Sequence, residues 1–259
     1  RLRVRGIERP PPEQRRTDRG GHRIDVRNGL FDLQLGQAVA ARVLDLQPRQ
    51  KHLLLQVNDA KARKYLCGHD ERHWFVAGVP AEARSVEHAM ELLQPGQVQQ
   101  ALRQAQVARK DRFARRNKVY LRQGEWFFVP APDLVVKNEL VLKNEPIRRG
   151  RGTPHFCQQL YRRGGTRVLP CHHYPNGLTE QDVKESLARE LPGYLPQTSR
   201  WVAPHDRCVK NGRWMVRDAE VFAKGRITHR DHETLALKEW HRVLMSKEVV
   251  KARFMAFLD

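Results

Sequence analysis

Acidic residues are absent from one long part of this sequence. Between Glu145 and Glu180, 34 consecutive residues contain no Asp or Glu but hold six Arg, three His and two Cys. No carboxylate within this acid-free segment can neutralise its cations, and the whole chain carries a formal net charge of +19 with a pI near 10.4. A surplus of this size indicates an anionic partner, and nucleic acid is the polyanion that fits it best.

Long apolar runs and cysteines are also scarce. No apolar run approaches the roughly 18 residues that would suggest a membrane-spanning helix, so we expect no membrane partner. Four Cys in 259 residues are too few for a disulfide scaffold. This cysteine usage favours a reducing compartment, and we expect a cytoplasmic protein.

Several catalytic and nucleotide-binding signatures are missing. The sequence contains no phosphate-binding loop ending in Gly-Lys-Ser or Gly-Lys-Thr, no Gly-x-Gly-x-x-Gly after a strand and no nucleophile elbow. The signatures of RNA-recognition motifs, KH domains and zinc fingers are absent too. A nucleotide cofactor is therefore not expected, and binding of nucleic acid must use a surface without a familiar motif.

The first 29 residues differ in composition from the rest. They hold nine Arg, the triplet Pro10-Pro11-Pro12 and almost no apolar periodicity. Because such a segment has little apolar surface to bury, we predict a flexible basic arm over residues 1–29. Residues 30–259 are predicted to form one domain, and a further boundary is open near residues 106–118, where charge becomes dense.

Hydrophobic spacing predicts short strands and few helices. Apolar patterning predicts strands at 41–46, 52–57, 65–67 and 74–77, and four such strands favour an antiparallel sheet. Helical spacing begins after Ser85, and Thr179 with Asp182 predicts a capping box at the start of another helix. We also predict a short helix over 154–163. Strands before and after a few helices indicate an α+β fold, mainly antiparallel sheet.

Two groups of basic residues are candidates for binding nucleic acid. Residues 109–118 are the densest, with six basic residues in ten, and the acid-free segment places Arg beside Gly, which lets the backbone approach phosphate. Guanidinium binds phosphate through two parallel hydrogen bonds and stays charged. The alternative for both groups is a solvated basic surface without a ligand. The candidate contacts are Arg109, Lys110, Arg112, Arg115, Arg116, Lys118, Arg148, Arg149, Arg151, Arg162, Arg163 and Arg167.

Cysteine and histidine occur together in the acid-free segment. Thiolate and imidazole are the ligands that zinc prefers in tetrahedral sites. The sequence therefore predicts a site for zinc or another divalent metal, with His155, Cys157, Cys171 and His173 as candidate ligands. The usual Cys-x-x-Cys spacing is absent, so buried thiols beside surface histidines are the alternative.

A second histidine-rich group lies late in the chain. His229, Asp231 and His232 are candidate catalytic residues, because imidazole and carboxylate close together can bind a metal or move protons near neutral pH. His232 is the expected general base or metal ligand. On a strand, His229 and Asp231 would share one face. The alternative is an ordinary polar turn.

Three functions are compatible with these features. The first is a protein that binds RNA or single-stranded DNA through its Arg-rich segments. The second is a metal-dependent phosphodiesterase or nuclease that uses the group from His229 to His232. The third is a structural protein of a nucleoprotein or phage-like assembly, in which positive charge serves packing. Whether the chain is an enzyme, and its oligomeric state, stay open at this point.

Overall fold

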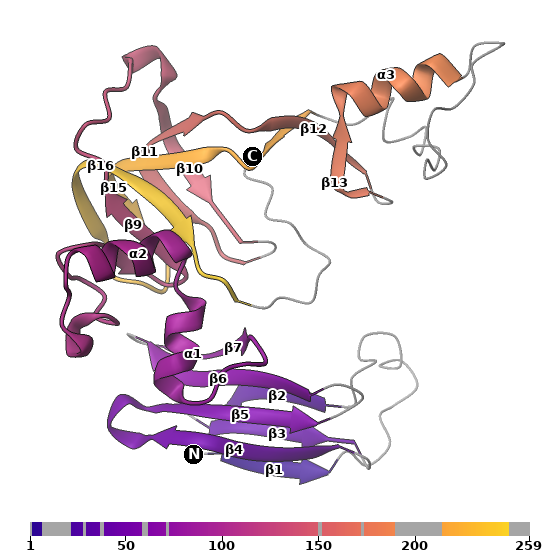
Figure 1. The fold of residues 1–259 in the computed structure, drawn as a ribbon, viewed down its shortest axis with the longest axis vertical. Helices are drawn as coiled ribbons and strands as arrows, with labels where there is room; N and C mark the ends of the chain where they lie inside the picture. Colours follow the sequence, from indigo (N-terminus) through magenta and orange to yellow (C-terminus); the bar gives the residue numbers. More distant parts are fainter. Residues whose placement is uncertain are drawn as a thin grey trace. The chain divides into compact units, whose positions relative to one another are not determined.

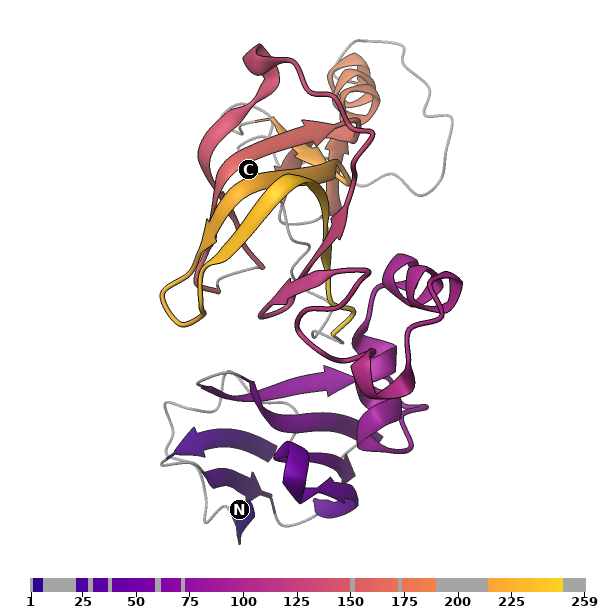
Figure 2. The same cartoon turned by 90° about the vertical axis from the view of Figure 1, so that its left-hand side faces the viewer.

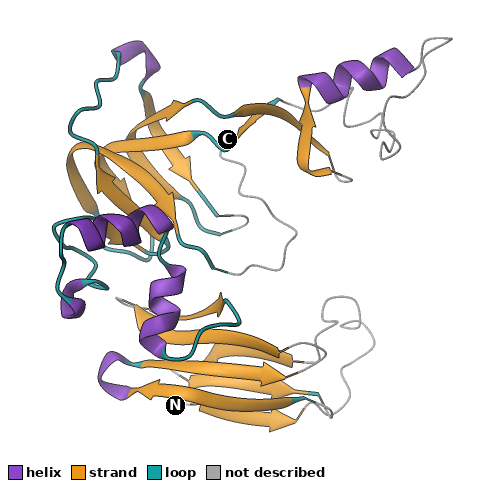
Figure 3. Cartoon of the chain, viewed as in Figure 1, coloured by secondary structure: helices purple, strands orange, loops and turns teal. Residues whose placement is uncertain are grey.

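The described part of the chain is mostly β-strand. The computed structural model describes residues 2–6, 22–27, 30–36, 39–58, 62–70, 73–149, 152–171, 174–189 and 214–248. Antiparallel strands dominate these residues, and three short α-helices accompany them (Figure 3). The prediction of mainly antiparallel sheet is confirmed, but the described residues are predominantly β rather than a balanced α+β fold.

Tertiary contacts gather the chain into two units. The first is built from residues 1–129, 231–233 and 244–250, and the second from residues 130–230, 234–243 and 251–259. The single domain that the sequence predicts over 30–259 stays a prediction, since compact units are not by themselves domains. The further boundary expected near 106–118 falls inside the first unit, because Val107 and Tyr120 are buried in its core.

The first unit begins with a three-stranded sheet in the order β1-β3-β2. The central strand β3 (Leu30–Leu35) runs parallel to β1 (Leu2–Gly6) and antiparallel to β2 (His22–Arg27). Two of these strands lie within residues 1–29, for which the sequence predicts a flexible arm. The difference has a physical basis, since β3 supplies backbone hydrogen-bond partners and its Phe31 and Leu33 are buried. Residues 7–21 lie outside the described residues.

A four-stranded antiparallel sheet follows, at the positions that the apolar patterning predicts. The order is β4-β5-β6-β7, so strands that follow one another in the chain are neighbours in the sheet. The short 3-10 helix η2 (Pro48–Gln50) turns the chain between the first two strands, and Lys51 completes the turn with φ of 57°. The strands are β4 (Ala40–Gln47), β5 (His52–Asn58), β6 (Ala62–Asp70) and β7 (His73–Val79).

Strand β5 is buried on both of its faces. Leu53, Leu55 and Val57 pack on one side against β3 and Cys67, whereas Leu54 points to the other side and packs with helix α1. Successive side chains of a strand alternate between faces, so an unbroken apolar run fits a central layer. The first unit therefore has the layers sheet, sheet and helix (Figure 1).

Two helices and a hairpin complete the first unit. Helix α1 (Val86–Leu93) ends before Pro95, and α2 (Gly96–Gln104) buries Val98 and Leu102. The chain then passes through the 3-10 helix η3 (Arg109–Asp111) into a hairpin of β8 (Leu121–Gln123) and β9 (Trp126–Pro130). None of the described α-helices has the length and apolarity needed to cross a bilayer.

The second unit contains a set of long antiparallel strands in the order β10-β11-β15-β16. They are β10 (Leu142–Ile147), which follows the 3-10 helix η4 (Asn138–Leu140), β11 (His155–Arg163), β15 (Glu220–Thr228) and β16 (Leu235–Met245). The predicted helix over 154–163 is wrong, because β11 occupies it. His155 and Cys157 are buried while Phe156 is exposed, and this alternation of two residues belongs to a strand.

A smaller sheet in the same unit has the order β13-β12-β14. Its strands are β12 (Thr166–Cys171), β13 (Tyr174–Thr179) and β14 (Met215–Arg217), and α3 (Glu180–Arg189) follows β13. The predicted capping box is confirmed. The Thr179 hydroxyl accepts from the Asp182 amide at 3.2 Å, and the Asp182 carboxylate accepts from the Thr179 amide at 2.7 Å.

Candidate functional site

Residues 108–120 of the first unit form a loop that we call the basic loop. It is not the continuation of a helix, because α2 ends at Gln104. Three side chains hold its backbone. The Arg112 carbonyl accepts from Gln94 Nε2 at 2.8 Å and from the Tyr120 hydroxyl at 2.7 Å. Asn117 Oδ1 accepts from the amides of Val119 and Tyr120 at 2.9 and 3.0 Å, so the loop has a defined shape.

The cations of the basic loop fall into two classes. Arg109 pairs with Glu87, Arg112 Nε donates to the Val107 carbonyl at 3.1 Å, and Arg115 is half-buried, which lowers its pKa. These three are engaged by the protein itself. Among the described residues, no ion pair neutralises the other three cations, and all three are exposed; they are Lys110, Arg116 and Lys118.

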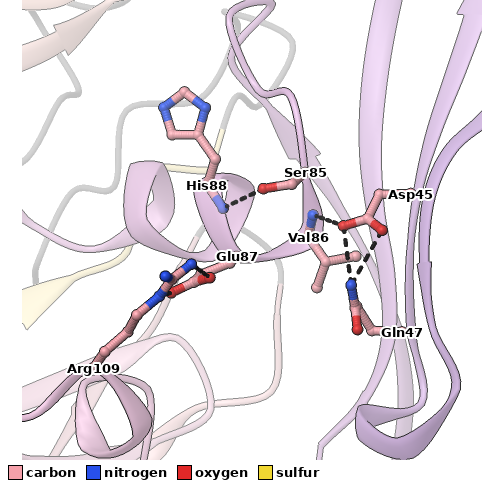
Figure 4. Close-up of polar contacts among 7 residues, drawn as sticks. All are labelled: Asp45, Gln47, Ser85, Val86, Glu87, His88 and Arg109. Atoms are coloured by element: carbon pink, nitrogen blue, oxygen red, sulfur yellow. Dashed lines mark hydrogen bonds and ion pairs between the residues drawn. The ribbon is translucent and has the colours of Figure 1, made fainter.

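The partner of Arg109 lies at the start of helix α1 (Figure 4). Ser85 caps this helix by accepting from the His88 amide at 3.1 Å, and Asp45 accepts from the Val86 amide at 2.7 Å. Glu87 follows in the first turn, where a carboxylate also interacts favourably with the helix dipole. The hydrogen bond from Arg109 lowers the pKa of Glu87. Arg109 therefore fastens the basic loop to α1 rather than serving as a free cation.

The acid-free segment of the second unit behaves differently. Arg162 pairs with Glu145 at 3.1 Å and Arg163 with Glu220 at 2.6 Å. These acids lie outside the segment on neighbouring strands, and Glu220 is the direct cross-strand neighbour of Arg163 in the β11–β15 register. The pairing lowers the pKa of Glu220, because the Arg163 hydrogen bond stabilises the carboxylate.

The remaining arginines of the segment have mixed surroundings. Arg167 pairs with Glu180 at 3.3 Å, and its guanidinium lies 5.3 Å from the centroid of the Trp214 ring. Arg148 is exposed and Arg149 is half-buried. Arg151 lies outside the described residues. Among the described arginines of the segment, Arg162, Arg163 and Arg167 are therefore paired with carboxylates that the segment itself lacks.

Two histidines meet where β11 begins and β15 ends. His155 is buried at the first position of β11, and the register pairs its neighbour Phe156 with Thr228, next to His229. The rings of His155 and His229 are stacked, with centroids 4.1 Å apart and planes inclined by 22°. His232 falls in the first unit, which takes in residues 231–233 of the turn that follows.

The segment from His229 to Thr234 is a turn and not a strand, as the hairpin of β15 and β16 in Figure 2 shows. The strand geometry considered for His229 and Asp231 therefore does not apply. His232 is half-buried, and this burial is the main reason that its pKa is lowered. A lowered pKa keeps the imidazole neutral near pH 7, the form that accepts a proton or binds a metal.

The described residues include only part of the predicted cysteine and histidine site. Cys157 is buried, which raises its thiol pKa to about 12, so the thiolate that zinc needs is disfavoured there. His155, the other described candidate of this group, stacks on the His229 ring instead. His173 and the Cys171 side chain lie outside the described residues. The structure thus sets His155 beside His229, two residues that the sequence assigns to separate sites.

No family model, curated protein or solved structure matches the chain. Function is therefore inferred from the side chains themselves.

Proposed function

We propose that the chain binds single-stranded nucleic acid, either RNA or DNA, through the basic loop of its first unit. The observation that carries this proposal is the exposure of Lys110, Arg116 and Lys118 on a loop whose backbone is held by internal hydrogen bonds. A fixed backbone lowers the entropy lost when cations are positioned against an anion. The net charge of +19 adds long-range attraction for a polyanion.

The arrangement suits a polyanionic strand better than one small anion. The three exposed cations are spread over nine residues of loop instead of converging in a glycine-rich phosphate cradle. A phosphate backbone offers repeated charges to such a surface, and each contact releases a counterion. Half-buried Phe113 in the same loop adds an aromatic ring, and the bases of single-stranded nucleic acid stack on such rings.

Salt dependence of binding tests the proposal directly. Fluorescence anisotropy with a labelled single-stranded oligonucleotide would be measured at several salt concentrations, for RNA and DNA in parallel. Each lost phosphate contact reduces the slope of log affinity against log salt by about 0.7. The triple variant Lys110→Gln, Arg116→Gln, Lys118→Gln should therefore flatten the slope by about 2 and weaken binding at low salt by about tenfold or more.

A matched variant separates local contact from net charge. Arg42, Arg49 and Arg84 are exposed cations of the same unit outside the basic loop. Replacing these three by Gln changes the net charge equally, and it should leave most of the affinity in place. An equal loss of oligonucleotide affinity in both triple variants would show that the basic loop is not part of the binding surface. Salt-independent binding, or none, would favour a structural role in an assembly.

A further inference from the structure

One face of the sheet in the second unit is exposed where β10, β11 and β15 lie side by side. On β11, Cys157 is buried while Phe156 is 46% exposed. On β15, Ile227 is buried while Arg226 and Thr228 on either side of it are exposed. Successive side chains of a strand point to opposite faces, and the register sets Phe156 directly opposite Thr228. The exposed residues of both strands therefore share one face, and the buried ones share the other.

The strand register gathers cations around the Phe156 ring. Pro146 of β10 and Thr228 of β15 are its direct cross-strand neighbours. Arg226 lies two residues before Thr228, which makes it a diagonal neighbour of Phe156. Arg148, just beyond the end of β10, has the same relation to Phe156 through Pro146, and both arginines are exposed. Diagonal neighbours lie about 7–8 Å apart, within reach of aromatic and long side chains.

This surface, which we call the Phe156 face, carries positive charge and no carboxylate. Among the described residues, no ion pair engages Arg148 or Arg226. Glu145, the acid of β10, lies opposite Cys157 in the register and so points to the other face, where it pairs with Arg162 at 3.1 Å. The members of the Phe156 face are Pro146, Arg148, Phe156, Gln158, Arg226, Thr228 and Ala236.

A glycine next to this face makes room for one of its polar side chains. Gly225 has φ of 84°, and the Gln158 Oε1 atom accepts from the Arg226 amide at 2.9 Å. A Cβ on residue 225 would lie 2.6 Å from that oxygen, so any larger residue there would displace Gln158. The absence of a side chain at Gly225 therefore lets Gln158 lie against the backbone of β15, while Phe156 remains exposed.

We propose that the Phe156 face is a second contact surface for single-stranded nucleic acid, with a base stacked on the Phe156 ring and phosphates bound by Arg148 and Arg226. The inference rests on the proposed function for the class of partner, but not on the basic loop, which belongs to the other unit. Aromatic side chains on a sheet surface suit unpaired bases, since every base has a flat face that stacks. In a duplex the bases are already stacked on one another, so the exposed ring favours a single strand.

Fluorescence anisotropy of the full chain with labelled single-stranded RNA and DNA oligonucleotides tests this face. Phe156→Leu keeps an apolar side chain without the ring and should weaken binding by about fivefold or more, whereas Phe156→Trp should retain the affinity. The double variant Arg148→Gln, Arg226→Gln should flatten the slope of log affinity against log salt by about 1.4. Lys137→Gln, Lys184→Gln is the matched control, because both lysines are exposed in the same unit outside the Phe156 face, and it should flatten the slope less.

Binding to a duplex separates stacking from damage to the sheet. Phe156→Leu should leave the affinity for a duplex unchanged, because paired bases do not reach the ring, and an equal loss for duplex and single strand would overturn the proposal. Urea unfolding verifies that each variant is folded. Should a variant unfold, ultraviolet crosslinking of the wild type to an oligonucleotide with 5-bromouracil decides the matter. Mass spectrometry should find a crosslink in the peptide that contains Phe156, and crosslinks in other peptides alone would overturn the proposal.

The outcomes separate this inference from the proposed function. If the basic-loop triple variant loses affinity while the variants of Phe156, Arg148 and Arg226 bind as the wild type does, the Phe156 face alone is excluded. Loss confined to the variants of the Phe156 face would support this surface and count against the basic loop. A wild type that binds no single-stranded oligonucleotide would overturn both.

Discussion

The basic loop of the first unit and the acid-free segment of the second are both rich in arginine, yet their cations end in different surroundings. In the basic loop, Lys110, Arg116 and Lys118 stay exposed without an ion pair among the described residues. In the acid-free segment, Arg162, Arg163 and Arg167 each meet a carboxylate. Among the described residues, the segment that lacks acidic residues in the sequence therefore has more of its arginines paired with carboxylates than the basic loop has.

The difference follows from secondary structure. A strand places its side chains beside those of neighbouring strands, and cross-strand partners of opposite charge stabilise a sheet. Glu145 and Glu220 reach Arg162 and Arg163 in this way. Loop side chains have fewer fixed neighbours, so their charges are left to solvent or to a ligand. A run of like charge is therefore better evidence for a binding surface when it lies on a loop.

The first test of this comparison weakens the hydrogen bonds that hold the basic loop without changing its charge. Asn117→Ala removes the acceptor for the Val119 and Tyr120 amides, and we expect the free energy of unfolding to fall by about 2 kcal/mol. Oligonucleotide affinity should fall as well, because the cations lose their fixed spacing. Urea unfolding and anisotropy measure the two effects.

Asn138→Ala serves as the control for the loosened loop. Asn138 is an exposed residue of η4, and its replacement should change stability by no more than about 0.5 kcal/mol. If Asn117→Ala destabilises the chain but binds the oligonucleotide as well as the wild type, a rigid loop is not what distinguishes the two regions.

The second test converts the neutralised region into a basic one. The double variant Glu145→Gln, Glu220→Gln releases Arg162, Arg163 and also Arg242, which lies 2.6 Å from Glu220. We expect oligonucleotide affinity to rise by about threefold and the salt slope to steepen by about 0.7 for each new contact. Anisotropy at several salt concentrations measures both.

A matched pair of acids controls for net charge in this test. Glu139 and Glu239 are exposed in the second unit and form no ion pair among the residues that the structure describes. Glu139→Gln, Glu239→Gln changes the charge equally and should raise affinity less. An equal gain in both double variants would mean that ion pairing does not mask the arginines.

The smallest expected effect concerns pH. The hydrogen bond from Arg163 holds the pKa of Glu220 below its ordinary value of 4.5. A lowered folded-state pKa gives stability that is complete above the unfolded-state pKa and is lost as pH falls through the folded-state value. The wild type should therefore lose more stability than Arg163→Gln between about pH 5 and about pH 3.

Urea midpoints at each pH measure this loss. The carboxylate and the guanidinium are both partly exposed, so the difference should be small and should shrink when salt is added. Parallel urea curves for wild type and variant across this range would show that the pair adds nothing to stability.

Much of the fold could be predicted from local pattern. The antiparallel strands β4 to β7 follow from apolar runs between turns, and α3 follows from the capping box of Thr179 and Asp182. The sequence predicts a helix over 154–163, but the structure has a strand there. The short mixture of polar and apolar residues in this segment is compatible with both helical and strand periodicity. Its pairing with β15, distant in sequence, decided between them.

The candidate site was predictable only in parts. Residue type identified His155 and His229 as metal or proton-transfer groups, but nothing in their spacing linked one to the other. The register that sets Phe156 beside Thr228 makes that link. Likewise, dense charge in residues 109–118 was visible in the sequence, whereas the engagement of Arg109 by Glu87 was not.

The sequence by itself determined the properties that depend on near neighbours in the chain: net charge, strand alternation, and helix caps such as Ser85. Tertiary structure decided which arginines are neutralised and which histidine rings stack. Ion pairing and metal ligation depend on distances of a few ångströms in space. Strand pairing sets those distances between residues far apart along the chain, so composition and spacing alone do not fix them.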